Sequence, residues 1–250
     1  PARPAPPMTP LLGAAAVLLA AFIKGAIGFG FPTLATPLLS LFIDVKAAVV
    51  VLILPNIVMD GIQFARRGAP LATVRRFAVL LVFGALGTVV GTRLLVALSS
   101  RTATLILGAF LLVFVTLSVT GATPRVPARG ERWLSPVAGL LAGVVGGLTN
   151  VPGTPLVIYF QALGMAKHEF VSSVAFTFVV YKLIQLGAVA YYGLLPWSLV
   201  GMSVLLIAVA LAGFAVGLKV QDRLEPRAFN RAVLGFLAAL GLWLVIRSVP

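Results

Sequence analysis

The sequence predicts an all-α, polytopic membrane protein with two inverted-topology repeats, each a broken helix or hairpin followed by three transmembrane helices. Hydrophobic residues make up 60% of the 250 residues and charged residues only 10%. The apolar residues come in runs of about 20 or more, which is long enough to cross a bilayer. Glycine, proline and basic residues also recur with matching spacing in the two halves of the chain.

The first half follows a Pro-rich stretch, residues 1–10, that we predict to be a flexible tail, and the first repeat covers residues 11–121. Its opening apolar run, Leu11 to Ile43, would be about 50 Å long as one α-helix, which is too long for an ordinary span. Glycines and prolines interrupt this run at Gly25, Gly28, Gly30, Pro32 and Pro37. We therefore predict a hairpin or broken helix. The three spans that follow are predicted at about 47–65, 77–98 and 102–120.

A polar, Pro- and Gly-containing linker over residues 122–132 separates the first repeat from the second, which covers residues 133–250. The second repeat also opens with a long apolar run, Leu134 to Leu163. The residues that interrupt it are Gly143, Gly146, Gly147, Pro152, Gly153 and Pro155. Three further spans are predicted at about 170–192, 197–218 and 229–247.

Two sets of residues recur in order in both halves, which indicates an internal duplication. The first set is Gly25, Gly28, Pro37 and Leu38, repeated as Gly143, Gly146, Pro155 and Leu156. The second set is Gly87, Gly91, Arg93 and Arg101, repeated as Gly213, Gly217, Lys219 and Arg227, so that each basic residue corresponds to another basic residue.

The distribution of basic residues predicts the orientation of the chain. If each opening run is a hairpin, twelve Lys and Arg residues lie on one side of the membrane and five on the other. If each run is a single span, the division is nine against eight, which carries no orientation signal. We therefore favour the hairpin. It makes the halves inverted and predicts a multi-pass protein of the cell inner membrane with both termini on the non-cytoplasmic side.

The composition also excludes several classes of partner. The net charge is +13, but the basic residues lie mostly in short loops between apolar runs, as positive-inside topology requires. We therefore predict membrane lipids and no nucleic acid as partners. Because the chain has no Cys and one His, we predict neither a metal site nor a cofactor.

Each interruption combines glycines with short polar side chains, in GAIGFGFPTLATP and GGLTNVPGTP. A helix that restarts inside the membrane directs free N–H groups and the positive end of its dipole into a cavity, which favours anion binding. The alternative is that these residues only allow a kink or close packing. The substrate-binding residues that we predict at the interruptions are Gly28, Phe29, Gly30, Thr33, Thr149, Asn150, Gly153 and Thr154.

Two lysines lie inside apolar runs, Lys24 beside the first interruption and Lys182 near the middle of its span. A charge at the bilayer centre costs roughly 2.5 to 3.5 kcal/mol on insertion scales, so it usually faces a cavity, a partner or a substrate. We predict that both lysines contact the anion. Snorkelling to the interface is the alternative, and it is weak for Lys182 because both ends of its span are distant.

Polar residues also repeat every four positions along two spans that correspond between the halves. They are Asn56 and Asp60, with Gln63 nearby, in the first half, and Ser173, Thr177, Tyr181 and Gln185 in the second. We predict that both faces line one cavity and that Asn56, Thr177, Tyr181 and Gln185 contact substrate. Hydrogen bonding between helices is the alternative. Asp60, the only acid well inside a span, pairs with a lysine, carries a coupling proton or caps Arg66 or Arg67.

The segments GAIGFGFPTLATPLL and GVVGGLTNVPGTPLV, with the repeated G-x3-G-x-[RK] pattern, resemble the TauE/SafE family of membrane permeases over nearly the whole chain. Pro32 in the first segment corresponds to Asn150 in the second, which is a departure from the repeated pattern. The resemblance implies transport of sulfite, an organosulfonate or a related sulfur-containing anion. The residues that carry it are Gly25, Gly28, Gly30, Pro32, Pro37, Gly143, Gly146, Pro152 and Pro155.

These observations predict a secondary transporter that exports a small anion by alternating access, with its site between the two interruptions. The chain has no G-x4-G-K-[ST] motif, so we do not predict ATP-driven transport. A small-anion channel and a membrane-embedded hydrolase are the alternatives. Neither interruption contains a carboxylate for metal-assisted hydrolysis, so we predict that the chain is not an enzyme. A homodimer is a further expectation.

Overall fold

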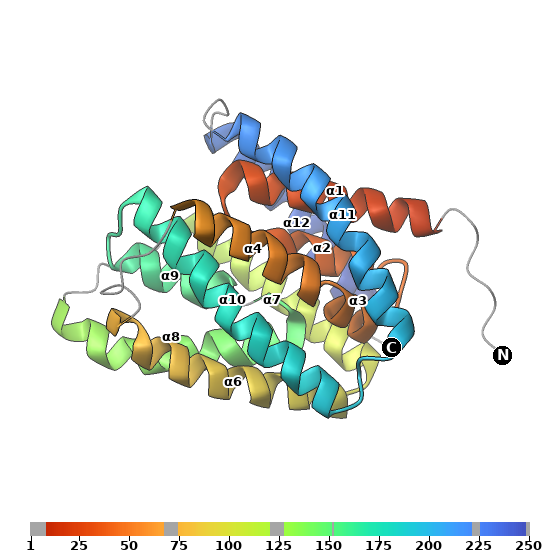
Figure 1. Ribbon diagram of the computed structural model, residues 1–250, viewed down its shortest axis with the longest axis horizontal. Helices are drawn as coiled ribbons and strands as arrows, with labels where there is room; N and C mark the ends of the chain where they lie inside the picture. The colour runs from red at the N-terminus through yellow and green to blue at the C-terminus, as the bar shows by residue number, and fades with distance from the viewer. Residues whose placement is uncertain (1–8, 68–74, 121–127, 152, 222–225, 249–250) are drawn as a thin grey trace.

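The computed structural model describes residues 9–67, 75–120, 128–151, 153–221 and 226–248, which form helices joined by short turns (Figure 1). Within this part of the chain, six helical segments are long and apolar enough to cross a bilayer. They are Pro10–Ile27, Val45–Arg66, Ala78–Ala97, Ser100–Thr120, His168–Tyr191 and Trp197–Val220. The prediction of an all-α, polytopic membrane protein is confirmed.

The first half of the chain opens with two helices rather than one long span. Its helices are α1 (Thr9–Ile27), α2 (Phe31–Leu39), α3 (Val45–Val51), α4 (Ile53–Arg67), α6 (Ala78–Ala97) and α7 (Ser100–Thr120). Asp44 caps α3, because its carboxylate accepts a hydrogen bond from the Lys46 N–H at 2.9 Å. The predicted spans 77–98 and 102–120 correspond to α6 and α7.

The second half contains five described helices and, like the first, opens with a long helix followed by a short one. They are α8 (Ala128–Thr149), α9 (Gly153–Ala162), α10 (Lys167–Tyr191), α11 (Trp197–Val220) and α12 (Pro226–Ser248). The start of α8 lies inside the range predicted as linker, and the rest of that range lies outside the described residues. Residues 1–8 of the predicted tail also lie outside them. In α12 the long apolar stretch is Val233–Ser248.

A proline explains why the predicted span 47–65 consists of two helices, α3 and α4, that meet at Leu52. Pro55 has no N–H, so the carbonyl oxygen of Val51, four residues earlier, loses its partner in the helix. The Ser203 hydroxyl of α11 donates to that oxygen at 2.6 Å. A side chain from the second half therefore satisfies the backbone group that the proline leaves open.

The first helix of each half packs most extensively against a helix of the other half. Helix α1 runs along α11 and α8 runs along α6, while α4 packs against α10 and α7 against α12. A Cβ on Gly87 or Gly91 of α6 would overlap the backbone of α8, and one on Gly213 or Gly217 of α11 would overlap that of α1. These glycines therefore let the helix backbones touch, as small-residue motifs do in membranes.

Some glycines that we predicted to interrupt the opening runs lie inside helices. They are Gly25 in α1 and Gly143, Gly146 and Gly147 in α8. A Cβ on Gly25 would overlap α11, and one on Gly143 or Gly147 would overlap α6. For these residues the predicted interruption is wrong, because a continuous helix needs glycine where another backbone lies against it. Helix α1 ends at Ile27 and α8 at Thr149, so the interruptions come later.

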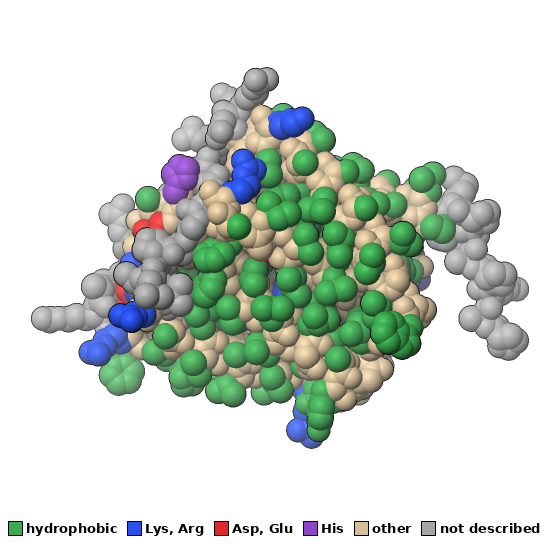
Figure 2. All heavy atoms as spheres, in the orientation of Figure 1, with side chains coloured by type: hydrophobic (Ala, Val, Ile, Leu, Met, Phe, Trp, Pro, Cys, Tyr) green, Lys and Arg blue, Asp and Glu red, His purple; other side chains and the backbone are tan. Residues whose placement is uncertain are grey.

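Apolar side chains cover most of the face shown in Figure 2, whereas Lys, Arg and His side chains gather mainly at its left end. Figure 1 shows that α1 begins and α12 ends at the right end. Beneath the apolar surface, a set of polar and charged side chains is almost fully buried. We give the name buried polar cluster to Lys24, Thr36, Asn56, Asp60, Gln63, Asn150, Lys182 and Gln185.

Candidate functional site

The two interruptions have backbone conformations that most residues avoid. Gly28 and Gly30 have φ angles of 99° and 96°, and Asn150 has a φ angle of 67°. Glycine has no Cβ to clash in this region, and asparagine is one of the few other residues found there. Gly30 is the residue just before α2 and, having no side chain, makes no capping hydrogen bond to that helix end. The first N–H groups of α2 therefore lack a side-chain partner.

In the first half, Lys24 of α1 forms an ion pair with Asp60 of α4. The Lys24 Nζ lies 2.5 Å from the Asp60 Oδ1, and both side chains are fully buried. The pairing of Asp60 with a lysine, one of the roles predicted from the sequence, is confirmed. Leaving either charge alone in this environment would be costly, so the pair is expected to be maintained.

In the second half, Lys182 of α10 donates hydrogen bonds to the Asn150 Oδ1 and, at 2.5 Å, to the Gln185 Oε1. The Asn150 Nδ2 donates to the Thr36 Oγ1 of α2 at 3.1 Å, so the second interruption contacts the first half. The Lys182 side chain is 1% exposed, and none of these hydrogen-bond partners carries a charge. The predicted residues Asn150, Lys182 and Gln185 are therefore brought together.

A glutamine on each polar helix binds the backbone near an interruption. The Gln63 Nε2 donates to the Gly28 carbonyl oxygen at 2.5 Å, and the Gln185 Nε2 donates to the Gly147 carbonyl oxygen at 3.1 Å. Gln63 and Thr36 were not among the predicted substrate-binding residues. The sequence signals that could have identified them are the place of Gln63 on the polar face of α4 and the place of Thr36 in the first interruption motif.

Several buried polar atoms have no hydrogen-bond partner within the described structure. They are the Asn56 Nδ2 and Oδ1, the Asp60 Oδ2, the Gln63 Oε1 and the Ser173 Oγ. Unpartnered polar atoms are rare in protein interiors and need an explanation such as a water, an ion or a ligand. All five belong to α4 or α10, two helices that pack against each other. Among the described residues, no group of His, Cys, Asp and Glu side chains could hold a metal ion.

The contact between α4 and α10 brings the two lysine sites close together. The rings of Phe64 and Phe176 meet at 5.1 Å between centroids, and the two helices run in opposite directions (Figure 1). Asp60, one turn before Phe64, therefore faces the stretch of α10 just before Lys182. Asp60 and Lys182 lie close enough to interact electrostatically. The two halves thus contribute to one charged cluster.

The structure does not bring every predicted residue into this cluster. The Tyr181 hydroxyl donates to the Leu80 carbonyl oxygen of α6 at 2.9 Å, and its ring belongs to a hydrophobic cluster with Tyr159 and Phe160. The Thr149 and Thr177 hydroxyls donate to backbone carbonyl oxygens of their own helices. Phe29 packs edge-on against Phe170, at 5.9 Å between ring centroids.

The remaining predicted residues give less information. Thr33 is 6% exposed, and Gly153 is the first residue of α9. The side chain of Thr154 lies outside the described residues.

A pocket of about 380 Å³ opens near the first interruption. It is lined by Gln63, Arg66, His168, Leu218 and Gln221. Gln63 therefore borders the pocket while its amide holds the Gly28 carbonyl oxygen. Arg66 and His168 are exposed and make this entrance basic. Gln63, which borders the pocket, lies less than one turn from Asp60 on α4.

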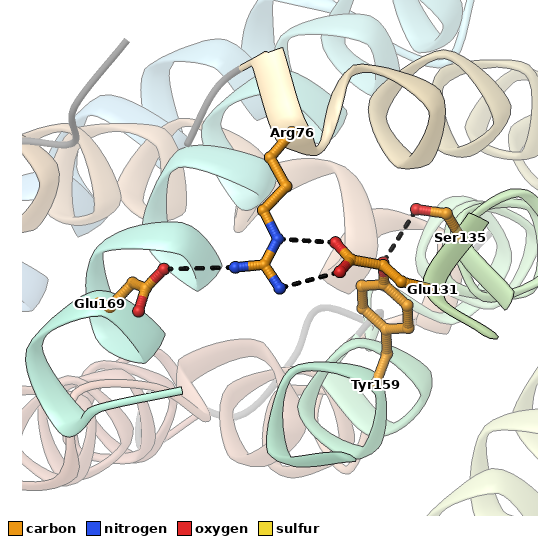
Figure 3. A network of polar contacts seen from close by, with 5 residues as sticks. All are labelled: Arg76, Glu131, Ser135, Tyr159 and Glu169. Carbon is orange, nitrogen blue, oxygen red and sulfur yellow. Dashed lines mark hydrogen bonds and ion pairs between the residues drawn. The ribbon is translucent and has the colours of Figure 1, made fainter. Parts of the chain in front are cut away.

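A second polar network joins the halves near the start of α6 (Figure 3). Arg76, just before α6, donates to both carboxylate oxygens of Glu131 on α8, at 2.7 and 2.8 Å. It also lies 3.8 Å from Glu169 of α10. The hydrogen bonds that Arg76 donates to the Glu131 carboxylate raise the pKa of Arg76. On the α8 side, the Ser135 and Tyr159 hydroxyls are 2.9 Å apart.

A model of the sulfite exporter TauE/SafE family matches residues 13–244, which confirms the resemblance found in the glycine and proline motifs. No curated protein and no solved structure matches the chain. Proteins of this family are transporters rather than enzymes, and the family implies a small anionic substrate. The chain is therefore a multi-pass membrane transporter of the TauE/SafE family.

Proposed function

We propose that this transporter exports sulfite, an organosulfonate or a related sulfur-containing anion by alternating access, and that the anion binds beside Lys182 between the two interruptions. The observation that carries the proposal is the hydrogen bonding of Lys182. Its ammonium group is buried, and the two oxygens that accept from it belong to the neutral amides of Asn150 and Gln185. A buried cation usually has an anionic partner, and a substrate anion would supply one.

The first interruption supports the same site. Pro32 has no N–H and the Leu34 N–H donates to the Gly30 carbonyl oxygen, so the N–H groups of Phe31 and Thr33 and the positive end of the α2 dipole are available to an anion. Asn150 hydrogen-bonds to Thr36 in the second half of that helix, which connects α2 to the surroundings of Lys182. The pocket bordered by Gln63 and Arg66 offers a basic entrance from one end of the molecule.

The packing of the helices supports an internal duplication, with repeats that we place at residues 11–121 and 133–250 and propose to be inverted. The opening helix of each repeat packs on the third long helix of the other, as α1 on α11 and α8 on α6. The two polar helices, α4 and α10, meet each other directly. Inverted repeats with a site at their interface are a common basis for alternating access.

Transport in proteoliposomes of the wild type and two lysine variants tests the proposal. Lys182→Met removes the buried cation, and Lys46→Met is the matched control, since Lys46 donates to the Val96 carbonyl oxygen at 3.0 Å away from the cluster. We expect Lys182→Met to lower anion affinity about 30-fold or more, because truncating a buried charged partner costs roughly 2 kcal/mol or more. Lys46→Met should transport like the wild type.

Equal transport by the wild type and Lys182→Met would contradict the proposed site. The channel alternative is distinguished by counterflow. For a transporter, loading the proteoliposomes with unlabelled sulfite or sulfonate should accelerate entry of the labelled anion. A channel shows no such acceleration and conducts current continuously.

A further inference from the structure

The buried charges of this protein form an unequal set. Among the described residues, the buried side chains that can carry a charge are Lys24, Asp60 and Lys182. Two ammonium groups and one carboxylate leave a single net positive charge. The Lys24 and Asp60 charges compensate each other across 2.5 Å, and Lys182 has only neutral hydrogen-bond acceptors.

We propose that this single excess charge makes the site selective for singly charged anions over doubly charged ones. The inference rests on the proposed function and adds the charge of the substrate. Within the sulfur-containing anions, it favours monoanions such as alkylsulfonates and hydrogen sulfite. It disfavours dianions such as sulfate, disulfonates and fully deprotonated sulfite.

The physical reason is the cost of net charge inside a membrane protein. A monoanion beside Lys182 makes the buried set neutral, whereas a dianion leaves it with one uncompensated negative charge. An uncompensated buried ion is penalised strongly, because the low-dielectric surroundings do not solvate it. The nearby carboxylate of Asp60 also repels the second negative charge.

Asn56 provides an independent indication that a polar ligand binds here. It is fully buried on α4, one turn before Asp60, and neither its Nδ2 nor its Oδ1 has a hydrogen-bond partner among the described residues. Since α4 and α10 run in opposite directions, Asn56 lies at the level of α10 that holds Gln185. Its amide N–H groups can donate to oxygens of an anion at Lys182 without changing the net charge.

The proposal predicts that selectivity follows the charge count. Asp60→Asn keeps the shape of the side chain and an acceptor for Lys24, but it raises the buried charge from one to two. A dianion then becomes the ligand that makes the set neutral. In the double variant Lys24→Gln, Asp60→Asn, both members of the ion pair become neutral and the net charge returns to one, so selectivity for monoanions should return.

The experiment measures binding of methanesulfonate and of 1,2-ethanedisulfonate to purified protein in detergent, by calorimetry and by thermal stabilisation. Binding is measured because a coupling role for Asp60 would stop flux without removing the site. We expect the wild type to prefer methanesulfonate about tenfold or more, Asp60→Asn to lose or reverse that preference, and the double variant to restore it.

Three outcomes separate the two proposals. If the Lys182→Met variant binds more weakly than the wild type, but the wild type binds both anions equally, the charge inference is overturned and the proposed function stands. If Asp60→Asn binds with wild-type selectivity, the charge inference is also overturned. If the wild type binds neither these anions nor sulfite, the proposed function itself fails. Should Asp60→Asn prove unstable, the double variant decides: a preference for the disulfonate there would contradict the charge count.

Discussion

Asn56 shows how a single buried residue can indicate function. It is fully buried, and both polar atoms of its amide lack a hydrogen-bond partner in the described structure. Such a group destabilises the protein unless water or a ligand satisfies it. The unpartnered amide of Asn56 is therefore explained if it binds the anion, even though it lowers the stability of the ligand-free protein.

Replacement of Asn56 by leucine tests this interpretation. Leucine has a similar volume and no polar atoms, so we expect the ligand-free protein to keep its melting temperature or to gain stability of about 1 kcal/mol. Stabilisation by the sulfonate should fall, because an amide donor to the anion is lost. The measurement is the melting temperature with and without methanesulfonate. A large loss of stability without ligand would instead assign Asn56 a structural hydrogen bond.

The two glutamines that bind the interruptions allow a direct comparison. Gln63 makes one hydrogen bond, to the Gly28 carbonyl oxygen, whereas Gln185 accepts from Lys182 and donates to the carbonyl oxygens of Gly146 and Gly147. We expect Gln185→Leu to destabilise the protein by about 2 to 3 kcal/mol and Gln63→Leu by about 1 kcal/mol. The loss is larger for Gln185→Leu because more buried groups lose their hydrogen-bond partner in that variant. Denaturation of both variants in detergent checks the order, and a reversed order would contradict it.

Sequence periodicity located the polar helix faces but not the partner of every side chain. Residues four apart on a helix are rotated by about 40° from each other, so a long stripe turns gradually around the helix. Ser173 and Gln185, at the two ends of the predicted face, therefore have different surroundings. Tyr181 lies against α6 and hydrogen-bonds to Leu80, whereas the next residue, Lys182, points toward Asn150. The neighbouring helices decide these contacts.

At the scale of helices, glycine determines which pairs can pack closely. A Cβ added to Gly87 would overlap the Leu140 carbonyl oxygen on α8, while one added to Gly201 of α11 meets no atom within 4 Å. Both glycines lie inside long apolar helices, so they form a matched pair. The sequence predicted close packing at Gly87 and Gly91, and the structure confirms it and identifies the partner as α8.

We expect Gly87→Ala to lower stability by about 1 to 3 kcal/mol or more, because two backbones must separate to admit one methyl group. Gly201→Ala should leave stability unchanged or raise it by up to about 1 kcal/mol, since alanine favours helix and the added methyl group meets no atom. Melting temperatures in detergent measure both effects. Equal losses in the two variants would mean that general helix propensity, not contact between α6 and α8, sets the cost.

For the whole molecule, the orientation in the membrane is a proposal with a direct test. The chain contains no cysteine, so any introduced cysteine is unique. His168 and Ser198 are exposed and lie near opposite ends of α10, at its start and just after the turn that follows it. If the basic end faces the cytoplasm, they lie on opposite sides of the membrane.

We expect a membrane-impermeant maleimide to label Ser198→Cys in intact cells and to label His168→Cys only after the membrane is opened. The measurement is the mass shift of the labelled protein. The opposite pattern would place both termini in the cytoplasm and contradict the proposed orientation.

The sequence by itself determined the membrane class, the family and most of the helices, because span length, loop charge and repeated glycine motifs are local properties of the chain. It also identified Lys24, Asp60, Asn150, Lys182 and Gln185, since polar residues inside apolar runs are conspicuous without a structure. Only the tertiary structure decided that Lys24 pairs with Asp60, that Lys182 hydrogen-bonds to neutral amides, and that Gly25 and Gly143 pack rather than interrupt. These outcomes depend on which helices of the two halves meet, and that pairing joins residues far apart in the sequence.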